Sequence, residues 1–282
     1  MKVLPFKIPK LEHDALIYQE DKAVLFYDKL HQHEEIQVSF IAEGSGTLIV
    51  GDTINDYKKG DVLVIGSNLS HVFKSEINGD TVSNMITLFF TKDAFGKDFF
   101  NLEELRELHP FFKRCNNGFK ISNTSKLFLP YFLKLKESTK LERFIILLAL
   151  LKLLAKSKYI SLSSFIYEKQ YTAIEGKRMR DVMEYTINNY HKNISLDTIA
   201  TVSTMTKNAF CKYFKKRTNK TYFKFLTELR VENACKLLIS NKDFSVAEIA
   251  EQSGFNNISN FNRQFKVVKK ISPSVFKKNN TL

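Results

Sequence analysis

The spacing of apolar residues divides the chain into a strand-like part followed by helix-like parts. Over about residues 15–90, short runs rich in Val, Ile, Phe and Tyr alternate with turn signals at 43–46, 59–61 and 78–80. Several short strands at this spacing predict a sandwich or barrel. From about 98 to 157, apolar residues recur every three or four positions, which predicts helices.

The most apolar of these predicted helices spans residues 141–156. One face carries five apolar residues: Leu141, Phe144, Ile145, Leu148 and Leu151. Three more leucines widen it: Leu147, Leu150 and Leu154. An apolar surface wider than one core requires indicates a helix from a partner chain, so it predicts a homodimer. A helix buried within its own domain fits the pattern equally well.

The last third of the chain carries one helical pattern twice. Ser195 and Ser245 begin the two copies, and in each an Ile-Ala pair and then two phenylalanines follow at matching intervals. The offset between the copies is 50 residues at the start and 51 from the phenylalanines onward. A repeat of this kind indicates one supersecondary unit used twice.

The second copy has the features of a helix-turn-helix. Ser245 and Glu248 have the spacing of a capping box. Gly254 stands where the chain must turn out of the first helix, and Ser259 is expected to start the next. Polar and basic residues fall on the outer side of that helix, as in helices that read a DNA major groove. A helix over 222–239 is expected to join the two copies.

The outward residues of the second helix in each copy are the candidate DNA contacts. Arg263 and Lys212 best suit guanine, and Asn208, Asn257 and Asn260 suit adenine or phosphate. For each of them, a phosphate contact or a solvated side chain is the alternative. The full set is Thr206, Lys207, Asn208, Cys211, Lys212, Lys215, Asn257, Ser259, Asn260, Arg263 and Lys266.

Charge supports a nucleic-acid partner for this part of the chain. The net charge is +13, and residues 181–282 hold 17 of the 43 basic and 8 of the 30 acidic residues. The basic excess therefore coincides with the repeat, which indicates a polyanionic partner. A lysine-rich composition alone would explain the charge but not this coincidence.

The cysteines and the apolar stretches indicate where in the cell the protein is located. The three cysteines, Cys115, Cys211 and Cys235, have no CxxC spacing, so neither a disulfide framework nor a zinc site is suggested. Cys211 is expected to be a small neighbour of DNA, with a thiol sensor as the second interpretation. The longest apolar stretch, 144–151, is far shorter than the roughly 20 residues of a membrane helix, and no signal peptide is evident. We therefore expect a soluble cytoplasmic protein with no membrane partner.

Residues 181–278 resemble the DNA-binding domain of the AraC family of bacterial transcription regulators. The matching positions are Ile249-Ala250, Gly254-Phe255, the run 259–266 and Ser272-Pro273, with equivalents in the first copy. Three positions depart from the family pattern. Lys270 and Asn219 stand where glycine is usual, and Tyr222 stands where proline is usual.

The strand-like part contains histidines at a suggestive spacing. Residues 31, 33, 35 and 37 would share one face of a strand, and His31 and His33 with His71 from a later strand have metal-site spacing. This resembles the cupin barrel that many AraC-family regulators carry as a sensor. In metal-binding cupins a glutamate falls where this chain has Gln37. We therefore expect an effector pocket lined by His31, His33, Gln37 and His71 without metal or cofactor. A bound metal is the second interpretation, and purely structural histidines are the third.

Together these features predict an α+β multidomain protein. A cupin-like domain for effector binding and dimerisation is expected over 1–158, with its barrel at about 15–90 and helices at about 98–157. A linker over 159–178 leads to an all-α DNA-binding domain over 179–282, with two helix-turn-helix units joined by a long helix.

The expected function is sequence-specific transcription regulation, not catalysis. The expected partners are double-stranded promoter DNA, an unknown small-molecule effector, a second copy through helix 141–156, and RNA polymerase if the protein is an activator. Two alternatives remain. One is a metal-dependent cupin enzyme with a nucleic-acid-binding appendage, and the other is a constitutive DNA binder that uses the barrel only to dimerise.

Overall fold

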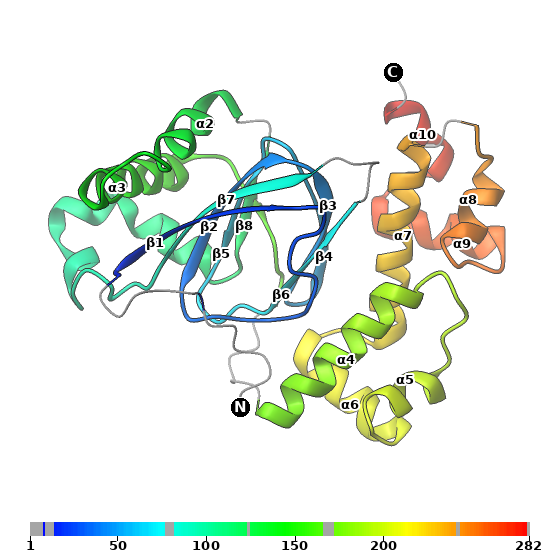
Figure 1. Ribbon diagram of the computed structural model, residues 1–282. Coiled ribbons are helices and arrows are strands. Elements are labelled where there is room, and N and C mark those ends of the chain that lie inside the picture. Colours follow the sequence, from blue (N-terminus) through cyan, green and yellow to red (C-terminus); the bar gives the residue numbers. More distant parts are fainter. Residues whose placement is uncertain are drawn as a thin grey trace. The chain divides into compact units, whose positions relative to one another are not determined.

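The computed structural model describes residue 8 and residues 14–76, 82–122, 125–165, 172–240 and 243–280 (Figure 1). The chain divides into two compact units, Met1–Gly176 and Lys177–Leu282. The first is rich in strands and the second is helical. The turn expected at 78–80 lies outside the described residues. No helix of the described residues is long and apolar enough to cross a membrane.

Two antiparallel sheets form the first unit, and within the described residues they share no strand. The larger has the order β1-β7-β2-β5-β8-β9 and the smaller β4-β3-β6. The strands of the larger sheet are β1 (Leu16–Ala23), β2 (Ile36–Glu43), β5 (Val62–Ile65), β7 (Ser83–Phe90), β8 (Phe119–Ile121) and β9 (Ile160–Ser161). Those of the smaller are β3 (Ser45–Val50), β4 (Thr53–Lys58) and β6 (His71–Ser75). The expected barrel is therefore seen as two separate sheets, not a closed cylinder, and β8 and β9 lie beyond the range expected for it.

The alternation of side chains along β2 separates two cores. Its even-numbered residues lie in the core beneath the helices: Ile36, Val38 and Phe40. Ile41 lies in the second core, together with residues of both sheets. Gln37 and Ser39 share the odd-numbered face with Ile41 and are also buried. Polar side chains on this face must therefore form hydrogen bonds with other buried groups between the sheets.

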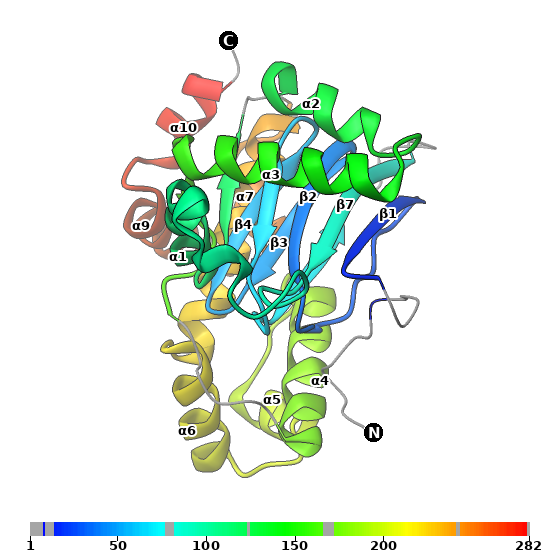
Figure 2. The same cartoon turned by 90° about the vertical axis from the view of Figure 1, so that its left-hand side faces the viewer.

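Helices cover one face of the larger sheet (Figure 2). They are η1 (Phe99–Asn101), η2 (Glu103–Leu108), α1 (His109–Cys115), α2 (Ser125–Lys134) and α3 (Lys140–Lys156). α3 buries the leucines that the pattern placed at the edge of its apolar face: Leu147, Leu150 and Leu154, together with Leu151. Leu141 and Ile145, expected on the main face, are 68% and 57% exposed. The helix is thus buried on one side and leaves apolar side chains on another.

The segment expected as a linker, 159–178, has structure at both ends. β9 pairs with β8, and the Asp52 carboxylate accepts hydrogen bonds from Ser164 and from the Phe165 backbone N–H. These contacts attach the beginning of the segment to the first unit. At its other end, α4 (Ala173–Asn189) has already begun. A two-residue strand and a carboxylate 112 positions away leave no signal in the local pattern.

The described residues from 173 onward form seven helices. They are α4, α5 (Leu196–Val202), α6 (Lys207–Thr218), α7 (Tyr222–Ser240), α8 (Val246–Gln252), α9 (Ile258–Lys269) and α10 (Pro273–Asn280). α5 with α6, and α8 with α9, form the two helix-turn-helix units, and α7 joins them. Phe210 and Phe214 pack on Tyr222 in the first unit. Phe261 and Phe265 lie in the core of the second, beside Leu238 of α7.

Candidate nucleic-acid interface and sensor pocket

The structure places all eleven candidate DNA contacts on the surface. In α6, Asn208 and Lys212 are four residues apart, with Cys211 and Lys215 on the same helical face. The positions 51 residues later in α9 are Ser259, Asn262, Arg263 and Lys266, and all are exposed. Asn262 was not predicted as a contact, although its equivalence to Cys211 in the repeat is a sequence signal for it. The two faces match in position but differ in chemistry.

The starts of the reader helices α6 and α9 differ in detail from the expectation. Thr206 caps α6 by accepting a hydrogen bond from the Ala209 N–H. Asn257 caps α9, and its Oδ1 accepts from the N–H groups of Ser259 and Asn260 at 2.8 and 3.0 Å. The expectation that Ser259 starts this helix was wrong, because Asn is as good an N-cap as Ser and stands two residues earlier. Asn257 can therefore offer DNA its amide N–H groups, while its oxygen is engaged.

Two further contacts restrain side chains on these helices. The Lys207 ammonium lies 2.8 Å from the Asp197 carboxylate. The Arg263 guanidinium donates to Asn260 Oδ1 at 3.0 Å, one helical turn away. Both pairs are exposed, so each contributes little to stability. Their consequence is geometric, since they hold cationic groups near the surface that would face DNA.

The turns before the reader helices use left-handed backbone at equivalent positions. Gly254 has φ +87° and Thr204 has φ 54°. A Cβ on Gly254 would lie 2.6 Å from the Tyr190 carbonyl oxygen. Glycine is thus required there by both backbone conformation and space. The expected capping box also forms, since Ser245 and Glu248 exchange hydrogen bonds.

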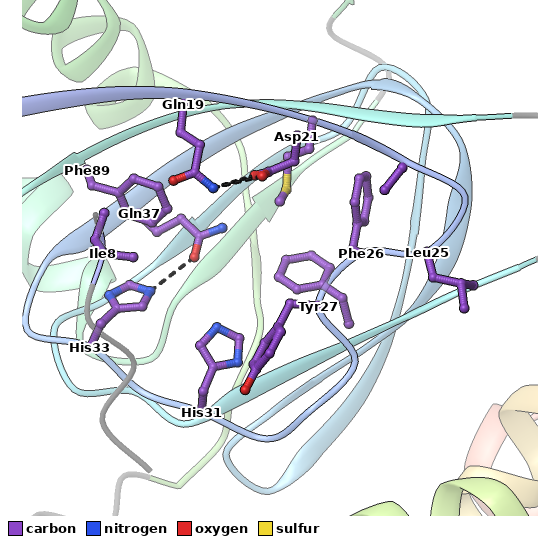
Figure 3. Close-up of a pocket in the computed structure, with 13 residues that line it drawn as sticks. Ile8, Gln19, Asp21, Leu25, Phe26, Tyr27, His31, His33, Gln37 and Phe89 are labelled. Atoms are coloured by element: carbon purple, nitrogen blue, oxygen red, sulfur yellow. Dashed lines mark hydrogen bonds between the residues drawn. The ribbon is translucent and has the colours of Figure 1, made fainter. Parts of the chain in front are cut away.

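The first unit contains a cavity of about 170 Å³ beside the histidines (Figure 3). His31, His33 and Gln37 line one part of it. The remaining lining is largely aromatic or apolar, with one polar pair, and includes Gln19, Asp21, Phe26, Tyr27, Phe73, Met85 and Phe89. Gln19 Nε2 donates to Asp21 Oδ1 at 2.7 Å, and burial raises the pKa of Asp21. This pair was not predicted from the sequence, because β1 pairs with β7 through a register that only the folded sheet defines.

The three histidines lie close together, but not because His31 and His33 share a strand face, as was expected. β2 begins at Ile36, so His31 and His33 precede the strand and do not share a strand face. His31 instead forms an isolated bridge with His71, exchanging two backbone hydrogen bonds of 3.0 and 2.9 Å. The ring centroids of His31 and His71 are 4.1 Å apart, and those of His33 and His71 are 5.2 Å apart. His71 is fully buried and is not among the residues that line the cavity.

A chain of hydrogen bonds runs from the histidines into the space between the sheets. His33 Nε2 lies 3.2 Å from Gln37 Oε1. Gln37 Nε2 donates to Ser39 Oγ at 2.9 Å, and Ser39 Oγ lies 2.8 Å from Thr87 Oγ1. Burial lowers the pKa of His33 and, together with the neighbouring histidines, lowers that of His71 well below its usual value. Burial thus favours the neutral form of both rings.

The helical part of the chain resembles known helix-turn-helix proteins. A family model described as a helix-turn-helix domain matches residues 199–279. The uncharacterized HTH-type transcriptional regulator YdeC of Bacillus subtilis is 23% identical over 258 residues, covering 90% of this chain and 88% of YdeC. The transposon Tn10 TetD protein of Escherichia coli is 30% identical over 101 residues, covering 36% of this chain and 72% of TetD. The structure of a probable AraC family transcriptional regulator from Rhodopseudomonas palustris CGA009 is 21% identical, with TM-score 0.35, covering 37% of this chain and 98% of that one.

Two helix-turn-helix units on one helical framework, with exposed basic reader helices, define a DNA-binding transcription regulator. The chain belongs to the AraC family.

Proposed function

We propose that this regulator responds to a small effector that binds in the cavity of its first unit. The observation that carries the proposal is the arrangement of His31, His33 and Gln37 at one part of an otherwise largely apolar cavity. A concave site with a few convergent polar groups is the usual form of a small-molecule site. The two facing sheets and their helices would then be a cupin-like sensor over about 1–158, connected by 159–178 to the DNA-binding domain. We assign no reaction to this cavity.

The DNA contacts proposed for this regulator are the exposed residues of α6 and α9. Arg263 and Lys212 occupy equivalent positions on the two helices and are proposed to contact guanine. Lys215 and Lys266, one turn further on, are proposed to contact phosphate. Because Cys211 is matched by Asn262, the two helices would read different sequences. The two DNA segments contacted by α6 and α9 of one chain would then differ in sequence.

Dimerisation is proposed through the exposed side of α3. Leu141 and Ile145 are one turn apart and largely exposed, and Leu133 of α2 is 58% exposed. Exposed leucine and isoleucine on adjacent helices would lose their contact with water if a second copy covered them. A dimer would present two DNA-binding domains and so demand two half-sites. Contact with RNA polymerase is proposed only for the case that the protein activates transcription.

The direct test is a promoter-binding assay with the full chain. Fragments from its own upstream region are compared with scrambled DNA of equal length by gel shift over a range of salt concentrations. We expect a sequence preference that survives at salt concentrations where binding to scrambled DNA is lost. Binding that is equally weak and equally salt-sensitive on both DNAs would contradict sequence-specific regulation.

The sensor role is tested separately. A panel of polar metabolites is screened for ligands that raise the unfolding temperature, and each positive is retested for an effect on operator affinity. A linked change in both is expected for an effector. If no compound changes either, the alternative of a constitutive DNA binder is favoured.

A further inference from the structure

The charge of the cavity lining indicates which class of effector the cavity takes. Gln19 and Asp21 lie two residues apart on β1, so they share the strand face that lines the cavity. Among the described residues that line it, Asp21 is the one carboxylate, and there is no lysine or arginine. The cavity therefore contains an acidic side chain without a basic one to balance it.

The Asp21 carboxylate has an uncharged partner. Gln19 Nε2 donates to its two oxygens at 2.7 and 3.0 Å. Burial raises the pKa of Asp21, and no cation of the described chain lowers it. Removing a carboxylate from water without a counter-charge is unfavourable. A cation bound beside Asp21 would therefore supply an electrostatic contact that the described residues do not provide.

The amide groups of the lining also favour a ligand that donates hydrogen bonds. The amide nitrogen of Gln19 is directed at Asp21, and that of Gln37 donates to Ser39 Oγ at 2.9 Å. Figure 3 shows Gln19 and Asp21 on one side of the cavity, away from His31. A ligand at this side meets the carboxylate oxygens and Gln19 Oε1, which are acceptors. An ammonium group has three N–H donors and no acceptor, so it matches this set.

The other lining residues disfavour anions and polyols. Phe26, Phe73 and Phe89 contribute aromatic surface, and Met85 lies opposite Asp21 in the pairing of β1 with β7. A ligand with many hydroxyl groups would leave several of them without partners against this surface, which is costly. An anion would be repelled by the carboxylate. The lining therefore suits a ligand with one cationic group and an apolar body.

The volume of the cavity limits the size of that body. The cavity measures about 170 Å³. An engineered cavity of about 150 Å³ holds one benzene molecule. A single ring with a short substituent is therefore of suitable size. Aromatic faces within about 6 Å of an ammonium group also attract it.

We propose that the effector is a small primary amine with an aromatic or apolar body, bound as its cation. Its ammonium group donates to the Asp21 carboxylate and to Gln19 Oε1, and its body packs against Phe26, Phe73 and Phe89. Alkylammonium groups such as that of lysine have a pKa of about 10.4, so such a ligand is charged at pH 7. This inference rests on the proposed sensor role of the cavity and names the class of effector that it takes.

The test compares three probes of similar size and different charge: benzylamine, benzyl alcohol and benzoate. Each is titrated into the full-length protein at pH 7 by isothermal titration calorimetry. We expect benzylamine to bind at least about tenfold more tightly than benzyl alcohol, because a hydrogen bond to a charged group contributes more than a neutral one. Benzoate should bind more weakly than either. This comparison uses the natural chain and does not depend on the folding of any variant.

Asp21→Asn removes the charge and keeps an oxygen that can accept from Gln19. It should weaken benzylamine binding at least about tenfold and change benzyl alcohol binding by less than about twofold. Glu20→Gln is the matched control, since it makes the same chemical change on the opposite face of β1, where Glu20 pairs with Lys22. It should leave the affinity for benzylamine unchanged.

Each of several outcomes would overturn the proposal. One is no binding of benzylamine at concentrations up to about 10 mM. Another is a preference for benzylamine over benzyl alcohol of less than about tenfold. The others are a smaller loss in Asp21→Asn than expected, or an equal loss in Glu20→Gln.

Operator gel shifts with and without benzylamine separate this inference from the proposed function. Benzylamine that binds through Asp21 without changing operator affinity supports the amine site but counts against the sensor role. If benzylamine does not bind while another metabolite changes both the unfolding temperature and operator affinity, only the amine site is removed.

Discussion

Asn219 and Lys270 end the two reader helices in the same left-handed backbone conformation. Asn219 follows α6 with φ 53°, and Lys270 follows α9 with φ 66°. The Lys270 N–H donates to the Lys266 carbonyl at 2.9 Å, closing the last turn of α9. Glycine is the residue best suited to such a turn, so this chain keeps the turn without it.

Lys270→Gly should therefore stabilise the DNA-binding unit. A side chain in the left-handed region costs about 1–2 kcal/mol, so we expect a gain of about 1 kcal/mol in the free energy of unfolding by urea. Asn219→Gly should gain less, because Asn tolerates this conformation. Lys266→Gly is the control within the same helix, and it should lose about 1 kcal/mol because glycine is unfavourable inside helices. A loss for Lys270→Gly would mean that its side chain makes a stabilising contact.

Gly254→Ala should be strongly destabilising. The new Cβ would meet the Tyr190 carbonyl and the Arg230 guanidinium, which itself donates to that carbonyl at 2.7 Å. The backbone conformation adds its own cost, so a loss of about 2 kcal/mol or more is expected. Thr204→Gly, at the equivalent turn of the first copy, should have the opposite sign. Urea unfolding of both variants checks this, and an unchanged stability of Gly254→Ala would show that Tyr190 and Arg230 can shift to make room for the new Cβ.

Arg263→Ala and Lys266→Ala should separate base reading from phosphate binding. Loss of a bidentate guanine contact costs about 1–3 kcal/mol and relaxes preference at one base pair. Loss of a phosphate contact weakens all sequences alike and reduces the slope of affinity against salt by about one. Binding to single-substituted operators at several salt concentrations distinguishes the two. If Arg263→Ala weakens every sequence equally, Arg263 is a phosphate contact and the second unit serves to position the first.

Acid should destabilise the first unit through its buried histidines. Burial lowers the folded-state pKa of His33 and His71 below the unfolded value of about 6.5. Below about pH 6.5 the unfolded chain takes up protons that the native rings do not. The contribution of these histidines to the free energy of unfolding is therefore fully present above about pH 6.5. It falls as the pH decreases, by up to about 1.4 kcal/mol per pH unit for each histidine.

The pH effect can be measured by thermal unfolding between pH 7 and pH 5 in EDTA. The double variant His33→Gln, His71→Gln should be less stable at pH 7 but should show a shallower decline. An equal decline in both proteins would assign the acid sensitivity to other groups.

Local sequence determined much of the helical unit. The capping box at Ser245, the glycine turn at Gly254 and the long helix α7 all formed as the pattern predicted. These features depend on contacts within a few residues of the chain. The error at the start of α9 was of the same local kind, since two good capping residues, Asn257 and Ser259, stand close together.

The sensor unit depended on contacts between distant segments. The sequence drew attention to His31, His33, Gln37 and His71, but only folding decided that His31 pairs with His71 through the main chain and that His71 Nε2 is left unpaired. The strand register brought Gln19 and Asp21 to the cavity, and packing selected which leucines of α3 are buried. The physical reason is that local pattern records which residues prefer a helix, a turn or the interior. Which buried groups meet is set by the pairing of segments far apart in the chain.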